Sequence, residues 1–246
     1  MKVFTLDLSN EDVTLTAYIP EYSSEMPHLE KRPAILVIPG GAYKMCSDRE
    51  AEPVALAFMN KGYAAFILRY SVGKGKAAFP RPLNDAEEAL ELIHENADEW
   101  RIDASKIAAI GFSAGGHLCA ALGAMGRIRP AACILGYPCI LESMGRILAD
   151  PIPGIDEYVD EKTSATFIFA SCEDTCVPIE NSIKYMAALN KYKIPFEVHI
   201  YEKGYHGFST SDNVVYSRKE DFEYNKDTAS WVELCMTWLG KRFDFR

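Results

Sequence analysis

The chain has 246 residues, a formal net charge of −9 and no marked cluster of lysine and arginine. Its length suits one α/β domain with a sizeable core, so we predict a single domain over residues 1–246. The acidic balance argues against a nucleic-acid partner. No apolar run is long enough to span a membrane, and the first residues lack a signal-peptide pattern, so we expect no membrane partner and a cytoplasmic location.

The chain begins with a predicted hairpin and continues as strands that alternate with helices. Residues 1–8 and 13–19 are expected to pair as antiparallel strands. Apolar runs and helical stripes then predict, in chain order, strand 34–38, helix 50–61, strand 64–68, helix 83–99, a strand from 106 that runs into a helix, strand 166–170, helix 181–192, strand 196–201 and helix 228–243. This alternation predicts an α/β fold with a mostly parallel, doubly wound sheet flanked by helices and antiparallel strands at its N-terminus.

The buried strand 34–38 is followed by Pro39-Gly40-Gly41-Ala42-Tyr43. Glycines let a backbone approach a ligand closely, so we expect the N–H groups of Gly41 or Ala42 to bind a developing oxyanion, ahead of that of Gly40. In some α/β folds the loop after this strand has a His-Gly-Gly-Gly-type stretch that supplies such a donor, and here Pro39 replaces the histidine and Ala42 the last glycine. A plain structural turn is the alternative.

The strand from residue 106 runs into a Gly-x-Ser-x-Gly turn, with Gly111 and Gly115 on either side of Ser113. Side chains at both glycine positions would clash in so sharp an elbow, which lifts the Ser113 hydroxyl clear of the backbone. The N–H of Ala114, at the start of the next helix, can point at an oxyanion. The alternative is a glycine-rich loop that touches no substrate.

An acid and a histidine follow in the chain order that such a serine requires. Asp174 comes in the loop after strand 166–170, and His206 in the loop after strand 196–201. Because ligands bind outside the carboxyl ends of the strands in an open α/β sheet, we expect both residues to meet Ser113 at one edge.

Two neighbours compete for these roles. Glu173 is adjacent to Asp174 and could be the acid, although the Asp-x-x-Val-Pro spacing favours Asp174. His117 lies one helical turn after Ser113, but its side chain should point back along the helix, so we expect a packing role.

Two connections are expected to shape the pocket: residues 69–81 and the longer insertion 136–165, which could include a short helix over 144–148. Tyr43, Tyr137 and Tyr205 fall in loops at the catalytic edge, where their rings could stack on a sugar. Ordinary packing is the alternative for each ring.

Four segments together resemble the α/β-hydrolase superfamily, in particular its small acetyl-esterase branch related to bacterial acetyl xylan esterases. They are residues 39–43, 99–117, 173–182 and 196–206, and the likeness extends from about 34 to 208. The resemblance implies an α/β-hydrolase fold and removal of acetyl groups from sugars. Tyr205, where a glycine is common, and the poorly matching insertion 136–165 leave the substrate open.

We therefore expect a serine carboxylesterase that hydrolyses short-chain acyl esters and removes acetyl groups from carbohydrates such as xylo-oligosaccharides. The expected catalytic triad is Ser113, His206 and Asp174. The expected oxyanion hole is formed by Gly41, Ala42 and Ala114. Another enzyme on the same fold, such as a peptidase or formamidase, and a binding module are the alternatives. We expect no cofactor and no metal, because the seven cysteines lack finger-like spacing and fit reduced thiols.

Overall fold

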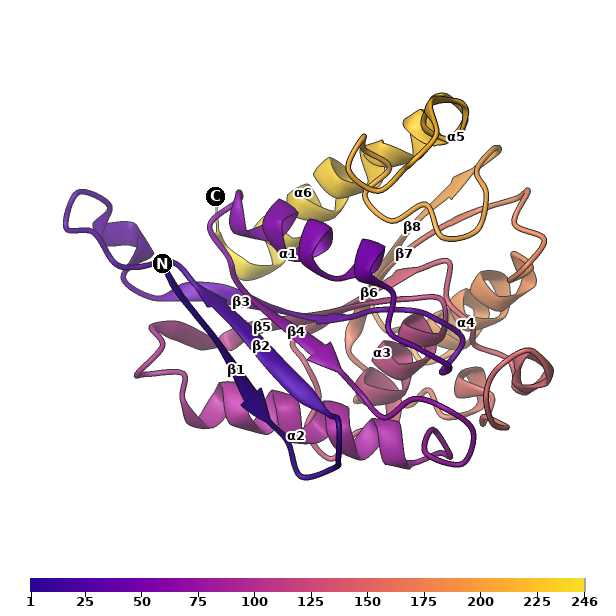
Figure 1. Ribbon diagram of the computed structural model, residues 1–246, viewed down its shortest axis with the longest axis horizontal. Helices are drawn as coiled ribbons and strands as arrows, with labels where there is room; N and C mark the ends of the chain where they lie inside the picture. The colour runs from indigo at the N-terminus through magenta and orange to yellow at the C-terminus, as the bar shows by residue number, and fades with distance from the viewer. Residues whose placement is uncertain (246) are drawn as a thin grey trace.

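An eight-stranded β-sheet organises residues 1–245, which are the residues that the computed structural model describes (Figure 1). Its strand order is β1-β2-β4-β3-β5-β6-β7-β8. The strands are β1 (Lys2–Asp7), β2 (Thr14–Ile19), β3 (Arg32–Ile38), β4 (Ala64–Arg69), β5 (Ile102–Phe112), β6 (Ala132–Gly136), β7 (Ala165–Ser171) and β8 (Phe196–Tyr201). The β1–β2 and β2–β4 pairs are antiparallel and the other pairs are parallel, which confirms the predicted fold class.

The apolar runs in the middle of the sheet reflect burial on both faces. Every residue of β3 and β7 is buried, as expected for parallel strands that helices cover on two sides. β2 instead alternates between buried and half-buried positions. The edge strands β1 and β8 are the most exposed.

Helices cover both faces of the sheet. They are α1 (Glu52–Met59), α2 (Arg81–Glu95), α3 (Ala114–Met125), α4 (Glu180–Lys191), α5 (Lys219–Asn225) and α6 (Trp231–Phe243). Apolar residues of α2, α3 and α4 share one core cluster, and those of α1 and α6 share the other, on opposite faces of the sheet (Figure 1). No helix within residues 1–245 is both long and apolar enough to cross a membrane.

The structure differs from the sequence prediction in one strand and in several helices: strand β6 was not predicted, and helix boundaries shift. Helix α2 begins at Arg81 rather than 83, because Pro82 is tolerated in a first turn, and it ends before 99. A 3₁₀ helix over Lys226–Ser230 replaces the predicted first turn of α6. The short helix expected at 144–148 is a 3₁₀ helix over Glu142–Arg146. Helix α5 was not predicted, since its highly polar sequence has no apolar stripe.

The strand register brings several loop starts to one edge of the sheet. Ile38 is aligned with Gly111, Phe112 with Gly136, and Ser171 with Tyr201. Because these strands are parallel, the loops that follow them all leave from their carboxyl ends. The loops that contain the predicted site residues therefore start side by side.

Candidate active site

Ser113 occupies a sharp turn between β5 and α3. Its φ of 52° and ψ of −116° lie outside the helical and extended regions that neighbouring residues adopt. A Cβ atom at Gly111 would collide with the carbonyl of Gly115, and one at Gly115 would collide with the carbonyl of Ile38. Both glycines are therefore required for the chain to turn here, and the turn places the Ser113 side chain at the wall of a hollow.

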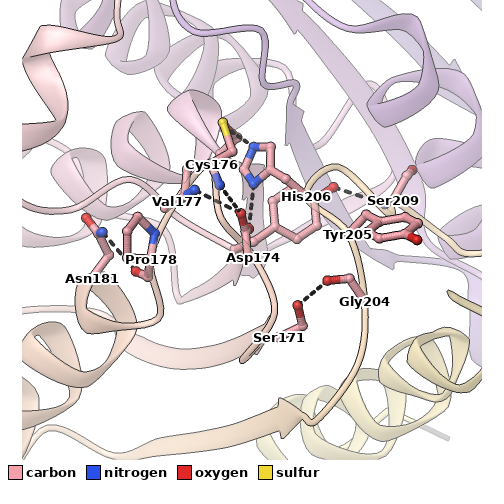
Figure 2. Close-up of polar contacts among 12 residues, drawn as sticks. Ser171, Asp174, Cys176, Val177, Pro178, Asn181, Gly204, Tyr205, His206 and Ser209 are labelled. Carbon is pink, nitrogen blue, oxygen red and sulfur yellow. Dashed lines mark hydrogen bonds and ion pairs between the residues drawn. The ribbon is translucent and has the colours of Figure 1, made fainter.

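Ser113, His206 and Asp174 form a hydrogen-bonded chain. Nε2 of His206 lies 2.9 Å from Oγ of Ser113, and Nδ1 lies 2.6 Å from Oδ2 of Asp174. The other carboxylate oxygen accepts the N–H groups of Cys176 and Val177, both at 2.9 Å, as Figure 2 shows. Asp174 is buried and acts as an acceptor only, so Nδ1 of His206 carries the proton and Nε2 is free to accept one from Ser113.

The two competitors for these roles lie elsewhere. The exposed carboxylate of Glu173 accepts a hydrogen bond from the hydroxyl of Tyr224. His117 is fully buried: its Nδ1 accepts the hydroxyl of Tyr43 at 2.8 Å, and its Nε2 donates to the carbonyl of Pro153 at 3.0 Å. Burial lowers the pKa of His117 to about 4, so the ring is neutral at pH 7. Both of its nitrogens are already taken by hydrogen bonds within the protein.

The loop after β3 lies against the same hollow. Gly41 and Ala42 line it, with φ values of 124° and 58°, while the Gly40 N–H is taken by a 2.8 Å hydrogen bond to Glu50. Within residues 1–245, the N–H groups of Gly41 and Ala42 have no hydrogen-bond partner. Ala114 begins helix α3 directly after Ser113. These backbone groups are the available donors beside the Ser113 hydroxyl.

Glu50 was not predicted from the sequence, and its buried carboxylate connects the walls of the site. Besides the Gly40 N–H, it accepts the hydroxyl of Tyr137 at 2.6 Å. That hydroxyl in turn accepts the Ser209 N–H at 3.0 Å, and the Tyr137 ring packs edge-on to the His206 ring at 5.0 Å between centroids. Glu50 thus holds both the loop after β3 and the loop that carries His206. Glu50 lies just before a helix, where an acidic residue is common because it stabilises the helix N-terminus, so the sequence gives no sign of this role.

The hollow beside Ser113 encloses about 270 Å³. The connection between β6 and β7 contributes Cys139, Ile147 and Leu148 to its wall, and the N–H of Ala149 donates to the carbonyl of Ala42 at 3.0 Å. Apolar side chains from this connection therefore form part of the wall. His206, Gly207 and Arg49 also line the hollow.

Comparison with known proteins identifies the family. The structure superimposes on the crystal structure of MGS-M1, an α/β-hydrolase enzyme from a Medee basin deep-sea metagenome library, with a TM-score of 0.93, 42% identity, and coverage of 99% of this chain and 98% of that one. The chain belongs to the α/β-hydrolase family. Residues 18–131 match the BD-FAE family model, and residues 150–230 match the prolyl oligopeptidase family model.

Two curated proteins are similar in sequence to this α/β hydrolase. It is 33% identical over 226 residues to endo-1,4-beta-xylanase B of Butyrivibrio fibrisolvens, an alignment that covers 80% of this chain and 36% of the relative. It is 29% identical over 232 residues to an acetylxylan esterase of Xylanibacter ruminicola, with coverage of 84% and 46%. The chain thus spans less than half the length of either relative.

The structure corrects two of the three predicted sugar-stacking tyrosines of the hydrolase. Tyr43 and Tyr137 are each only 1% exposed, so the prediction is wrong for both. Their hydroxyls bind His117 and Glu50, and their rings pack inside the protein because each loop turns back onto the core. Tyr205 is 51% exposed and stacks on Tyr224, with ring centroids 4.2 Å apart.

No group of three or more His, Cys, Asp or Glu residues in the described part of the hydrolase is arranged to hold a metal ion. All seven cysteines are free thiols. Burial raises the pKa of Cys139, which lies in the wall of the hollow, to about 12, so this thiol stays protonated beside Ser113.

Proposed function

We propose that this α/β hydrolase is a serine carboxylesterase that cleaves short acyl esters and removes acetyl groups from carbohydrates such as xylo-oligosaccharides. The observation that carries the proposal is the hydrogen-bonded chain Ser113–His206–Asp174 at a strand-to-helix elbow. A serine in this position has a base within reach and an acid to orient that base, which is the arrangement that nucleophilic acyl transfer requires.

In the proposed reaction, Oγ of Ser113 attacks the ester carbonyl carbon while Nε2 of His206 takes its proton. Asp174 keeps His206 in the productive tautomer and stabilises the imidazolium that forms. The carbonyl oxygen becomes an oxyanion, which the N–H groups of Ala114 and of Gly41 or Ala42 stabilise. The tetrahedral intermediate collapses, the C–O bond breaks, and His206 protonates the leaving alcohol. Water then attacks the acyl-enzyme with His206 again as base, releasing the acid and restoring Ser113.

The hollow beside Ser113 favours a short acyl group. Ile147 and Leu148 face it from the connection 136–165, and hydrogen bonds hold that connection to Ala42 and His117. A longer acyl chain gains at most about 0.8 kcal/mol for each methylene that it buries and loses more where it meets a fixed wall. The acetylxylan esterase relative supports acetate as the acyl group.

A panel of 4-nitrophenyl esters tests the acyl preference, with acetylated xylo-oligosaccharides as natural-type substrates. We expect kcat/KM to fall from acetate to butyrate to octanoate, and acetate to be released from the saccharides. Ser113→Ala should abolish turnover while keeping the fold. A profile that rises toward octanoate, or no acetate from any saccharide, would contradict the deacetylase proposal and leave a general esterase.

A peptidase is the second candidate, because residues 150–230 match the prolyl oligopeptidase family model. This match includes Asp174 and His206, but it begins after Ser113. Matched anilide and ester substrates with one acyl group separate the candidates. A kcat/KM for the anilide equal to that for the ester would favour the peptidase.

A further inference from the structure

A second hollow lies beside the first, on the far side of His206. It encloses about 200 Å³ and is walled by Arg49, Tyr205, His206, Gly207, Tyr216 and Arg218. Three of these residues, Arg49, His206 and Gly207, also line the hollow that contains Ser113. The two hollows therefore meet along the His206 loop, and we call the second one the Arg49 hollow.

Most polar groups in the Arg49 hollow are already paired. Arg218 binds Asp221 through two hydrogen bonds, of 2.8 and 2.9 Å. The side-chain amide of Asn225 accepts the Tyr205 N–H and donates to the carbonyl of Asp221. The hydroxyl of Tyr216 donates to the carbonyl of Phe208. The rim thus has few free hydrogen-bonding groups.

Arg49 is the exception. Its side chain is exposed and makes no hydrogen bond or ion pair with any residue in 1–245. Its Nη2 would lie 3.4 Å from a Cβ atom built on Gly207, so the guanidinium sits against the His206 loop. Burial raises the pKa of Tyr216; a hydrogen bond with Ser211 and the positive charge of Arg49 lower it, and the charges of Asp221 and Asp212 raise it. The adjacent Glu50 carboxylate does not neutralise Arg49 by contact, because Gly40 and Tyr137 occupy its oxygens.

The proposed chemistry decides which part of an ester lies here. His206 must protonate the leaving alcohol oxygen, so the alcohol part has to lie against the imidazole. The apolar side chains of Ile147 and Leu148 lie in the first hollow, which suits the acyl part. An alcohol larger than one small group would continue past His206 and Gly207 into the Arg49 hollow, where the exposed ring of Tyr205 forms one wall.

We infer that the Arg49 hollow binds the alcohol part of the ester and that the preferred alcohol carries a carboxylate, as an acidic sugar does; this rests on the proposed esterase function. A guanidinium offers N–H donors and no acceptor, and its planar fork matches the two oxygens of a carboxylate. Arg218 and Asp221 pair with each other, so the positive charge that remains at this hollow is that of Arg49. Arg49 is then a specificity-determining residue.

Two acetylated sugars test this inference: acetylated methyl glucuronide and acetylated methyl glucoside, which differ by a carboxylate in place of a hydroxymethyl group. We expect the wild-type kcat/KM to be higher for the glucuronide. Arg49→Gln should reduce this preference about tenfold, mainly through KM, since one charge-assisted contact at an exposed site is lost. Arg49→Lys should retain part of it. Arg101→Gln, the same change at a cation that lies over Tyr22, should leave the preference unchanged.

A binding measurement keeps this test separate from the esterase proposal. Calorimetry on the Ser113→Ala protein should show the glucuronide binding more tightly than the glucoside, and Arg49→Gln in that background should remove the difference. Equal binding of both sugars, or an equal loss for both with Arg49→Gln, would overturn the inference even if both are hydrolysed. If neither acetyl ester is turned over but the binding difference is found, the esterase proposal fails and the carboxylate site stands.

Discussion

Two histidines near Ser113 show how partners decide what an imidazole can do. His206 has a side chain that is 22% exposed, with a carboxylate on Nδ1 and the serine hydroxyl on Nε2. His117 is fully buried, with the hydroxyl of Tyr43 on Nδ1 and the carbonyl of Pro153 on Nε2. The first ring has a negative charge beside it and the second has none.

The difference assigns different roles to the two rings. A carboxylate partner stabilises an imidazolium, so His206 can hold a proton during a reaction. A protonated His117 would be a buried charge without a counter-charge, because its partners are neutral. Its two hydrogen bonds instead join helix α3 to the loop after β3 and to the connection 136–165. His117 therefore fixes the segments that form the hollow.

Replacing each histidine is the strongest test of this comparison. We expect His206→Ala to lower kcat for acetyl-ester hydrolysis about 10⁴-fold, because the serine loses its base. His117→Gln should lower it less than about tenfold and should destabilise the fold by about 1–3 kcal/mol through unpaired buried partners. Steady-state kinetics and urea unfolding measure the two effects. The reverse ranking of the kcat losses would show that the two roles are misassigned.

The acid that orients His206 provides the next test. Asp174→Asn should lower kcat about 10⁴-fold, since an amide favours the wrong tautomer of His206. Glu173→Gln is the matched control: its carboxylate binds Tyr224, so kcat should change by less than about threefold. Both variants remove one charge from adjacent positions in one loop. A larger loss in the Glu173 variant would make Glu173 the functional acid.

Glu50 extends the comparison to the residues that support His206. Glu50→Gln leaves one of two donors, the Gly40 N–H or the Tyr137 hydroxyl, without its carboxylate acceptor. We expect kcat to fall about 10- to 100-fold with little change in KM, because the oxyanion loop and the His206 loop shift.

Glu87→Gln is the control for Glu50, as this buried carboxylate also accepts one backbone N–H and one side-chain donor, both from Arg127. It should cost similar stability, about 1–3 kcal/mol, and leave kcat unchanged. Equal kcat losses in the two variants would reduce Glu50 to a general stability role.

The smallest expected effect is the pH dependence that His117 adds to stability. Its pKa is about 4 in the folded protein, because burial disfavours the charged ring, against about 6.5 when unfolded. Between these values the unfolded chain binds more protons, so the stability falls as the pH falls. Between pH 7 and pH 5, His117 should cost the wild-type protein about 2 kcal/mol of unfolding free energy, and His117→Gln should lack this loss. Parallel urea curves at both pH values measure it, and identical losses in wild type and variant would contradict the buried neutral ring.

Local chemistry made part of the site predictable from sequence. The elbow needs glycine at 111 and 115 because any Cβ there would strike the backbone, so the spacing itself marks Ser113. Asp174 and His206 follow apolar strands whose carboxyl ends share one edge, which the alternation of strands and helices already implies. These features depend on residues close together in the chain.

The orientation of loop side chains was not predictable in this way. Tyr43, Tyr137 and Tyr205 all follow strands at the same edge, yet two are buried and one is exposed. The partner of Tyr137 is Glu50, 87 positions away, and the partner of Tyr43 is His117, 74 positions away. Only the folded loops bring these groups into contact.

The sequence by itself determined most of the strand and helix alternation, the sharp turn at Ser113 and the order of serine, acid and histidine, because apolar periodicity and glycine sterics act within a few residues. The tertiary structure decided which acid faces His206, which histidine is buried, and where Glu50 and Arg49 lie. Those outcomes depend on loops that pack against one another across the sheet edge. A carboxylate or an imidazole takes its chemistry from the partners and the solvent around it, and these are set only when the chain has folded.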